Sequence, residues 1–141
     1  MAVAPILSDD AAGAEALAVF DDIRAKRQTD YVNNFWRALA HDPALLRATW
    51  ERVQAVMAPG ALDPLVKEMV YIAVSVANGC SYCIHSHTAA ARAKGMTDAQ
   101  HGELMAVIAM AAQTNALATT LQVPVDDRFT VTEGGQTDDT A

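Results

Sequence analysis

The sequence of 141 residues predicts an all-α fold in a single domain. Two observations favour it. The chain contains 29 alanines, the best helix-forming residue, and its apolar residues recur at helical spacing through residues 9–123, without the alternation of a half-buried strand. We expect an N-terminal helical segment at residues 1–32, a core at residues 33–123, and an acidic, disordered tail at residues 124–141.

The first half of the chain predicts three helices. Residues 8–10, a serine and two aspartates, offer N-caps to a first helix that ends near a basic cluster before position 28. A short helix follows around residues 35–39. Asp42–Pro43 is then an N-cap followed by proline at the first helical position, and Pro59–Gly60 ends the third helix.

The next two helices are separated by a very short turn. Asp63–Pro64 repeats the start signal and precedes Leu65–Ala77, which is apolar on almost all sides. Such a helix should be buried, within this subunit or between subunits. Asn78–Gly79 ends it, because both residues tolerate the left-handed conformation of a helix C-cap. A helix from about residue 80 to residue 94 follows and ends at Gly95.

A last long helix completes the predicted fold. Thr97 and Gln100 have the spacing of a capping box at its start. Four apolar residues are expected to form its buried face: Leu104, Val107, Ile108 and Ala111. Pro124 ends the ordered region, because the sequence after it is polar, contains two adjacent glycines and has few large apolar residues.

Charge and hydropathy exclude several classes of protein. The formal net charge of −7 argues against nucleic-acid binding, which needs a clustered basic surface, although −4 of that charge follows Pro124. The longest unbroken apolar runs, Met69–Val74 and Met105–Ala112, are shorter than the roughly 20 residues of a membrane span. With two cysteines and no signal-like N-terminus, we expect a cytoplasmic protein without a disulfide scaffold.

One stretch departs from simple helix packing. Cys80, Cys83 and His87 lie at positions i, i+3 and i+7 of the predicted helix and therefore on one face. Residues three apart on a helix have Cβ atoms about 5–6 Å apart, close to the range of a disulfide. The positive end of the helix dipole stabilises a thiolate, and a histidine one turn further can accept its proton. This pattern predicts a reactive thiol pair.

Glu68 is the one carboxylate of the preceding apolar helix. A carboxylate in such surroundings needs a partner or a raised pKa, and either condition suits a proton relay. Ser75, seven residues later, shares its side of the helix. The short turn folds the two helices together, so Glu68 can approach Cys83 and His87. The alternative is a buried ion pair of Glu68 with an arginine such as Arg92.

The four residues Glu68, Cys80, Cys83 and His87 follow the pattern of a glutamate, eleven residues, Cys-x-x-Cys, three residues and a histidine. With this signature, Asn33 to Val123 resembles the alkylhydroperoxidase D (AhpD) branch of the carboxymuconolactone decarboxylase superfamily. The resemblance implies a helical bundle, usually a trimer or hexamer, with thiol-dependent hydroperoxidase activity and no cofactor or metal.

The same resemblance implies a role for each residue of the signature. Cys83 would be the peroxidatic thiolate and Cys80 the resolving thiol, while Glu68 and His87 would move protons. A dithiol reductant, of the thioredoxin or lipoyl type, would reopen the disulfide. The hydroperoxide is the expected substrate.

The chain also departs from that family. Well-studied AhpD proteins have a histidine between the two cysteines, whereas this chain has Ser81–Tyr82 there and His85 after them. We expect His85 on another face of the helix, and Tyr82 either in packing or at the pocket. Three other functions stay open: a lactone decarboxylase, a module held by zinc on the four signature residues, and a redox sensor without rapid turnover.

Overall fold

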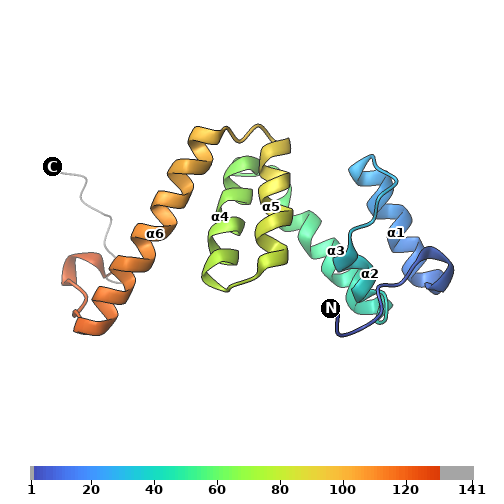
Figure 1. The fold of residues 1–141 in the computed structure, drawn as a ribbon, viewed down its shortest axis with the longest axis horizontal. Coiled ribbons are helices and arrows are strands. Elements are labelled where there is room, and N and C mark those ends of the chain that lie inside the picture. The colour runs from blue at the N-terminus through green and yellow to red at the C-terminus, as the bar shows by residue number, and fades with distance from the viewer. Residues whose placement is uncertain (1, 131–141) are drawn as a thin grey trace. The chain divides into compact units, whose positions relative to one another are not determined.

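A computed structural model describes residues 2–130 and, within them, contains six α-helices and no strand (Figure 1). The α-helices are α1 (Ala14–Arg27), α2 (Asn34–Leu39), α3 (Pro43–Met57), α4 (Pro64–Ala77), α5 (Ser81–Ala93) and α6 (Asp98–Leu121). Two short 3-10 helices, η1 (Asp9–Ala11) and η2 (Asp127–Phe129), lie outside them. The predicted all-α class is confirmed. The chain forms two compact units, one ending at Pro64 and one beginning at Leu65, and each has its own core.

The first unit is built from α1, α2 and α3. Its core contains fully buried Phe20, Ile23 and Leu46, and the rings of Trp36 and Trp50 meet edge to face with centroids 5.3 Å apart. The start signals act as predicted at α3, where the Asp42 carboxylate accepts a hydrogen bond of 3.0 Å from the N–H of Leu45 and Pro43 is the first helical residue. The unit is thus a packed helical subdomain, distinct from the unit that contains the cysteines.

Within the first unit, ion pairs of Asp9 join η1 to α1 and α2. The Asp9 carboxylate contacts Arg37 at 2.9 Å with one oxygen and Arg24 with the other. Hydrogen bonds from Arg37 and Arg24, in that order, lower the pKa of Asp9 below its ordinary value. Asp9, predicted as an N-cap, therefore joins α1 to α2 instead.

In the second unit, α4 and α5 lie side by side and antiparallel (Figure 1). The turn between them depends on Gly79, whose φ of +67° is the left-handed conformation expected for this position. The N–H of Cys80 closes the turn by donating to the carbonyl of Ser75 at 2.9 Å. Gly95, with φ of +94°, ends α5 in the same way. Gly79 and Gly95 therefore lie at the two ends of α5 and limit its length.

The core of this unit is small, and α4 is buried along one stripe only. Buried Ile72, Ala91 and Met96 pack with half-buried apolar side chains of α4 and α6. The other buried residues of α4 are Glu68 and Ser75, while Val70 and Val74 are each 53% exposed. Burial of this helix within the subunit, one of the two expected forms, is therefore limited to this stripe, and two of its three buried residues, Glu68 and Ser75, are polar.

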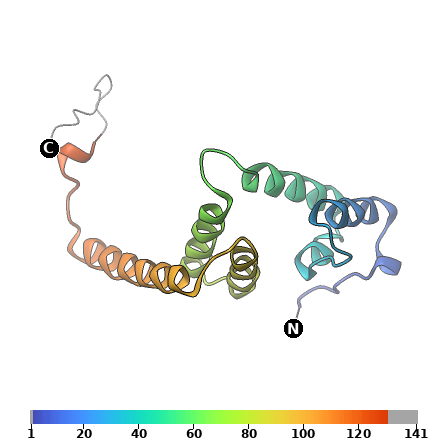
Figure 2. The ribbon, with the colours of Figure 1, turned by 90° about the horizontal axis from the view of Figure 1, so that it is seen from above.

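The last α-helix, α6, is more exposed than the other five α-helices. The predicted capping box is present, since Thr97 Oγ1 accepts from the N–H of Gln100 and the Gln100 side chain accepts from the N–H of Thr97. Leu104 and Ile108 pack against the core, but no residue of α6 is fully buried. Val107, expected on the buried face, is 65% exposed. The C-terminal half of α6 extends away from α4 and α5 (Figure 2).

Two further expectations concern this end of the chain. By length and composition alone α6 is long and apolar enough to cross a membrane, and its most apolar stretch is not buried. Polar residues interrupt its apolar runs, which is why the runs themselves stay short. The sequence predicts a disordered tail at residues 124–141. The first part of this tail contains the short 3-10 helix η2, and residues 131–141 lie outside the described part.

Candidate functional site

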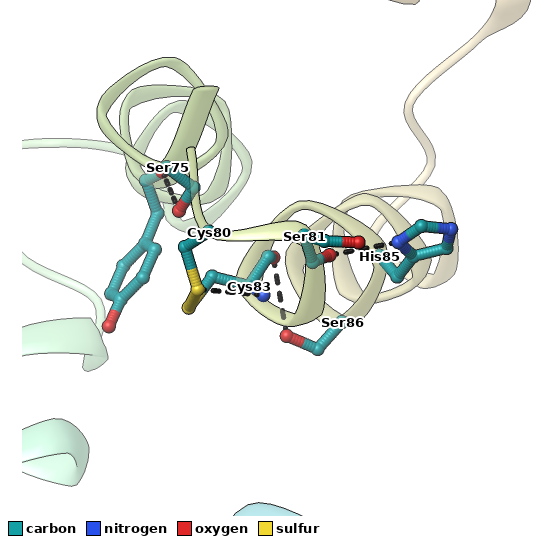
Figure 3. The surroundings of a disulfide bond; sticks show 7 residues. Ser75, Cys80, Ser81, Cys83, His85 and Ser86 are labelled. Atoms are coloured by element: carbon teal, nitrogen blue, oxygen red, sulfur yellow. Dashed lines mark hydrogen bonds between the residues drawn. A yellow bond between two sulfur atoms is a disulfide. The ribbon is translucent and has the colours of Figure 1, made fainter. Parts of the chain in front are cut away.

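The two cysteines form a disulfide at the start of α5 (Figure 3). Their Cα atoms are 5.3 Å apart, as the predicted spacing on one helical turn requires. Cys80 is the N-cap, and its Sγ accepts a hydrogen bond of 3.2 Å from the N–H of Cys83. Both side chains are half-buried. The expected closeness of the two sulfurs is confirmed.

The position of the cysteines favours the thiolate form once the bond is reduced. The first turn of α5 contains no acidic residue, so nothing on this helix offsets the partial positive charge of its N-terminus. Cys80 and Cys83 both lie at that end of α5, and the N–H of Cys83 is directed toward the Cys80 sulfur. Such surroundings lower the pKa of a thiol and increase its reactivity.

Glu68 and His87 are in direct contact across the α4–α5 pair. Glu68 Oε2 lies 2.7 Å from His87 Nδ1, and the Glu68 side chain is only 6% exposed. The other carboxylate oxygen, Oε1, accepts a hydrogen bond of 2.9 Å from Lys94 Nζ. The predicted approach of Glu68 to His87 is therefore observed. Cys83 lies four residues before His87 on α5, which is one helical turn.

The cation that pairs with Glu68 is Lys94, and not Arg92 as the sequence suggested. Arg92 forms its contact with Asp98 instead, at 2.8 Å, on the exposed side of α5. Lys94 contacts Glu68, and this residue was missed by sequence reasoning. The signal was available, because Lys94 lies seven residues after His87 and so on the same stripe of α5, whereas Arg92 is rotated away from it.

The contacts of Glu68 fix its charge. Burial by itself raises the pKa of Glu68, but the hydrogen bonds from His87 and Lys94 and the charge of Lys94 outweigh it, so that the pKa falls below its ordinary value. Glu68 is thus a carboxylate at neutral pH and can only accept hydrogen bonds. In the 2.7 Å contact Nδ1 of neutral His87 must then carry the proton, which leaves Nε2 as the basic nitrogen.

Tyr71 is the second residue of the site that the sequence did not reveal. Its ring stacks on the imidazole of His87 with centroids 3.5 Å apart and an interplanar angle of 20°. Tyr71 lies three residues after Glu68 on α4, so both side chains lie toward α5. The imidazole is therefore oriented by a hydrogen bond at one edge and by an aromatic ring on one face.

Other predicted residues lie outside this cluster. Ser75 is buried on the Glu68 side of α4, but its hydroxyl donates to the backbone carbonyl of Tyr71 at 2.7 Å. His85 projects from the side of α5 away from the disulfide, where Nδ1 contacts the Ser81 carbonyl at 2.8 Å (Figure 3). The expected separate face of His85 is confirmed. Tyr82 is 44% exposed.

An apolar pocket of about 520 Å³ lies among α4, α5 and α6, on the side of α5 that carries Ile84 and His85. Its lining is completed by Ile72, Val76, Thr88, Ala89, Arg92, His101, Leu104, Met105 and Ile108. Neither the cysteines nor Glu68 and His87 contribute to this lining. Within residues 2–130, no three His, Cys, Asp or Glu side chains are grouped closely enough to hold a metal ion.

The chain was compared with known proteins. Residues 43–126 match the model of the carboxymuconolactone decarboxylase family. The chain is also similar to a crystal structure of the alkylhydroperoxidase AhpD core from Rhodospirillum rubrum ATCC 11170, with 62% sequence identity and a TM-score of 0.90. That match covers 94% of this chain and 99% of the other. A comparison with curated proteins gave no match.

Proposed function

Because the chain belongs to the carboxymuconolactone decarboxylase family, as an AhpD-like member, we propose that it is a thiol-dependent hydroperoxidase that uses Cys80 and Cys83. The observation that carries the proposal is the disulfide at the start of α5, one helical turn from a histidine whose free nitrogen is basic. A dithiol that cycles through a disulfide needs a thiolate and a proton acceptor, and this arrangement supplies both.

The roles of the two cysteines follow from their distance along α5 from His87. Cys83 is one turn away and Cys80 nearly two, so Cys83 is the thiol whose proton His87 Nε2 takes. The Cys83 thiolate attacks the terminal oxygen of the hydroperoxide, the O–O bond breaks, and the alkoxide leaves as an alcohol with the proton from His87. Cys83 becomes a sulfenic acid, and Glu68 balances the charge on the imidazolium.

The second half of the cycle forms the disulfide. The Cys80 sulfur attacks the sulfenic sulfur of Cys83, its proton passes to the departing hydroxyl, and water is released. A dithiol of the thioredoxin or lipoyl type then reduces the bond, which returns both thiols and oxidises the reductant to its own disulfide. Such reductants are kept reduced in the cytoplasm, which is the compartment that we propose.

A thiol titration tests this cycle directly. Treatment of the fully reduced protein with one equivalent of an organic hydroperoxide should remove both thiols and decrease its mass by two hydrogens, because both sulfurs enter the disulfide. The measurement combines a thiol reagent with intact-protein mass spectrometry. Thiols that persist after the peroxide would contradict the proposal.

If a Cys80→Ser, Cys83→Ser double variant still converted a carboxymuconolactone, the decarboxylase function would be favoured instead.

We also propose that a second copy of the chain covers α6, in the trimer or hexamer expected of the family. No charged residue lies between Glu103 and Asp126, so two acidic chains can approach there without repulsion. Large apolar side chains that a second copy would bury are Met105, Val107, Met110, Leu117 and Leu121, each more than half exposed. Polar residues such as Gln113 and Asn115 suit a protein interface better than hydrocarbon.

A charge on this face should dissociate the oligomer. We expect Val107→Glu combined with Met110→Glu to convert the protein to monomers, since two carboxylates cannot be buried there unpaired. Light scattering and sedimentation measure the mass, and Val3→Glu, an exposed apolar position of the first unit, is the control. A wild-type protein that is monomeric and binds phosphatidylcholine vesicles through α6 would overturn the proposal in favour of a membrane.

A further inference from the structure

We propose that Lys94 is a positioning residue of the thiol site, which keeps Glu68 a carboxylate so that His87 stays oriented with Nε2 free. This inference rests on the proposed function, because it concerns the proton acceptor for Cys83. Neither the family signature nor the pattern of cysteines includes this lysine.

The contacts of Glu68 carry the inference. Each carboxylate oxygen has one partner: Oε1 accepts from Lys94 Nζ at 2.9 Å, and Oε2 accepts from His87 Nδ1 at 2.7 Å. The Glu68 side chain is 6% exposed, whereas that of Lys94 is 39% exposed. The lysine therefore reaches from the surface toward an enclosed carboxylate and supplies the charge that water does not.

The backbone fixes the position from which Lys94 reaches. It is the C-cap of α5, and its N–H donates to the carbonyls of Ala90 and Ala91. Gly95 follows in the left-handed conformation and ends the helix. Fully buried Ala91 lies between His87 and Lys94 on the same stripe.

No other cation contacts Glu68 among the described residues. His87 and Lys94 of α5 are its two partners, and Tyr71 of α4 lies on the face of the His87 ring. From α6, the side chains that pack on this core are uncharged Leu104 and Ile108. Lys94 is thus the only permanent positive charge in contact with the Glu68–His87 pair within residues 2–130.

Removal of that charge should make the pair bind a proton more tightly. Burial opposes the carboxylate form of Glu68, and the hydrogen bonds from His87 and Lys94 together with the charge of Lys94 offset this. Without the lysine, a proton is retained on either Glu68 or His87 at higher pH, and the two groups titrate together. In either case, a smaller fraction of the molecules has an ionised Glu68 and an unprotonated His87 Nε2 at acidic pH.

The pH dependence of activity tests this role. In Lys94→Met we expect the acidic limb of kcat/KM to move upward by about one pH unit, so that activity below the limb falls about tenfold, while the alkaline plateau changes little. Lys94→Arg should restore the wild-type limb, and Arg92→Met, which removes a charge that contacts Asp98 and not the Glu68–His87 pair, should leave it in place. An unmoved limb in Lys94→Met would overturn the proposal, whatever the plateau.

A second measurement separates this inference from the proposed function. Nitrogen NMR of the His87 imidazole reports its tautomer and protonation without any turnover. We expect an Nδ1–H tautomer in the wild type, and proton uptake at higher pH in Lys94→Met and in Lys94→Gln, which keeps a donor but not the charge. An imidazole whose titration and tautomer are both unchanged in a folded variant would refute the role of Lys94. A shifted titration in a protein without peroxidase activity would refute only the proposed function.

Discussion

Cys83→Ser is expected to lower kcat/KM for an organic hydroperoxide by at least about 100-fold, measured as peroxide consumption with a dithiol reductant. A serine hydroxyl does not ionise near neutral pH and is a poor nucleophile toward an O–O bond. Cys80 does not replace Cys83, because it lies nearly two turns from His87 and its sulfur is the N-cap of α5. Full activity in this variant would remove Cys83 from the proposed chemistry.

Cys80→Ser is the matched variant. It keeps the Cys83 thiolate and its proton acceptor, so it should consume one equivalent of peroxide and then stop as a sulfenic acid. A 1,3-dione reagent should label Cys83 in this variant, and peptide mass spectrometry locates the adduct. If Cys83→Ser instead gave the single turnover, with the adduct on Cys80, the two roles would be exchanged.

Glu68→Gln should produce the second largest effect, a loss of about 100-fold in kcat/KM, typical of an impaired general base. Glutamine is neutral, so it no longer stabilises the imidazolium that forms when His87 takes the thiol proton. Steady-state kinetics measure the loss. Glu103→Gln, which changes an exposed carboxylate of α6, is the control and should retain full activity. Wild-type kinetics in Glu68→Gln would contradict the relay.

The same variant should change how stability depends on pH. Because the pKa of Glu68 is lower in the folded chain than in the unfolded one, its carboxylate stabilises the fold above the unfolded value, and this contribution disappears as the pH falls through the folded value. Glu68→Gln should therefore lose less stability than wild type on acidification. At neutral pH we expect a cost of about 1–2 kcal/mol, since Lys94 is partly solvated. Urea unfolding across this pH range measures both.

Much of the fold could be predicted because its boundaries are local. Proline and aspartate at the start of α3, the capping box of α6 and Gly79 act through neighbouring backbone groups, so a short stretch of sequence contains the whole cause. The burial of α6 could not be predicted in this way. Periodicity tells which side of a helix is apolar, but not what covers it, and Val107 is exposed where a buried face was expected.

In the candidate site, too, some features could be predicted from local sequence and others depend on how the helices pack. The contact of Glu68 with His87 follows from spacing and a short turn, and the disulfide follows from two cysteines on one helical turn. Lys94 and Tyr71 were missed because neither belongs to a motif. Spacing places Lys94 on the stripe of His87, but whether that stripe faces Glu68 and Tyr71 depends on how α4 and α5 are rotated against one another, which is set by the packing of Ile72 and Ala91.

The small separation of the two cysteines has a consequence for turnover. A crosslink stabilises a protein mainly by restricting the unfolded chain, and the restriction grows with the loop that it closes. Cys80 and Cys83 are three residues apart, which corresponds to about 2 kcal/mol, against almost 5 kcal/mol for a loop of 100 residues. The bond ties no helix to another. In the proposed cycle the chain can therefore open and close this bond with little loss of conformational order elsewhere.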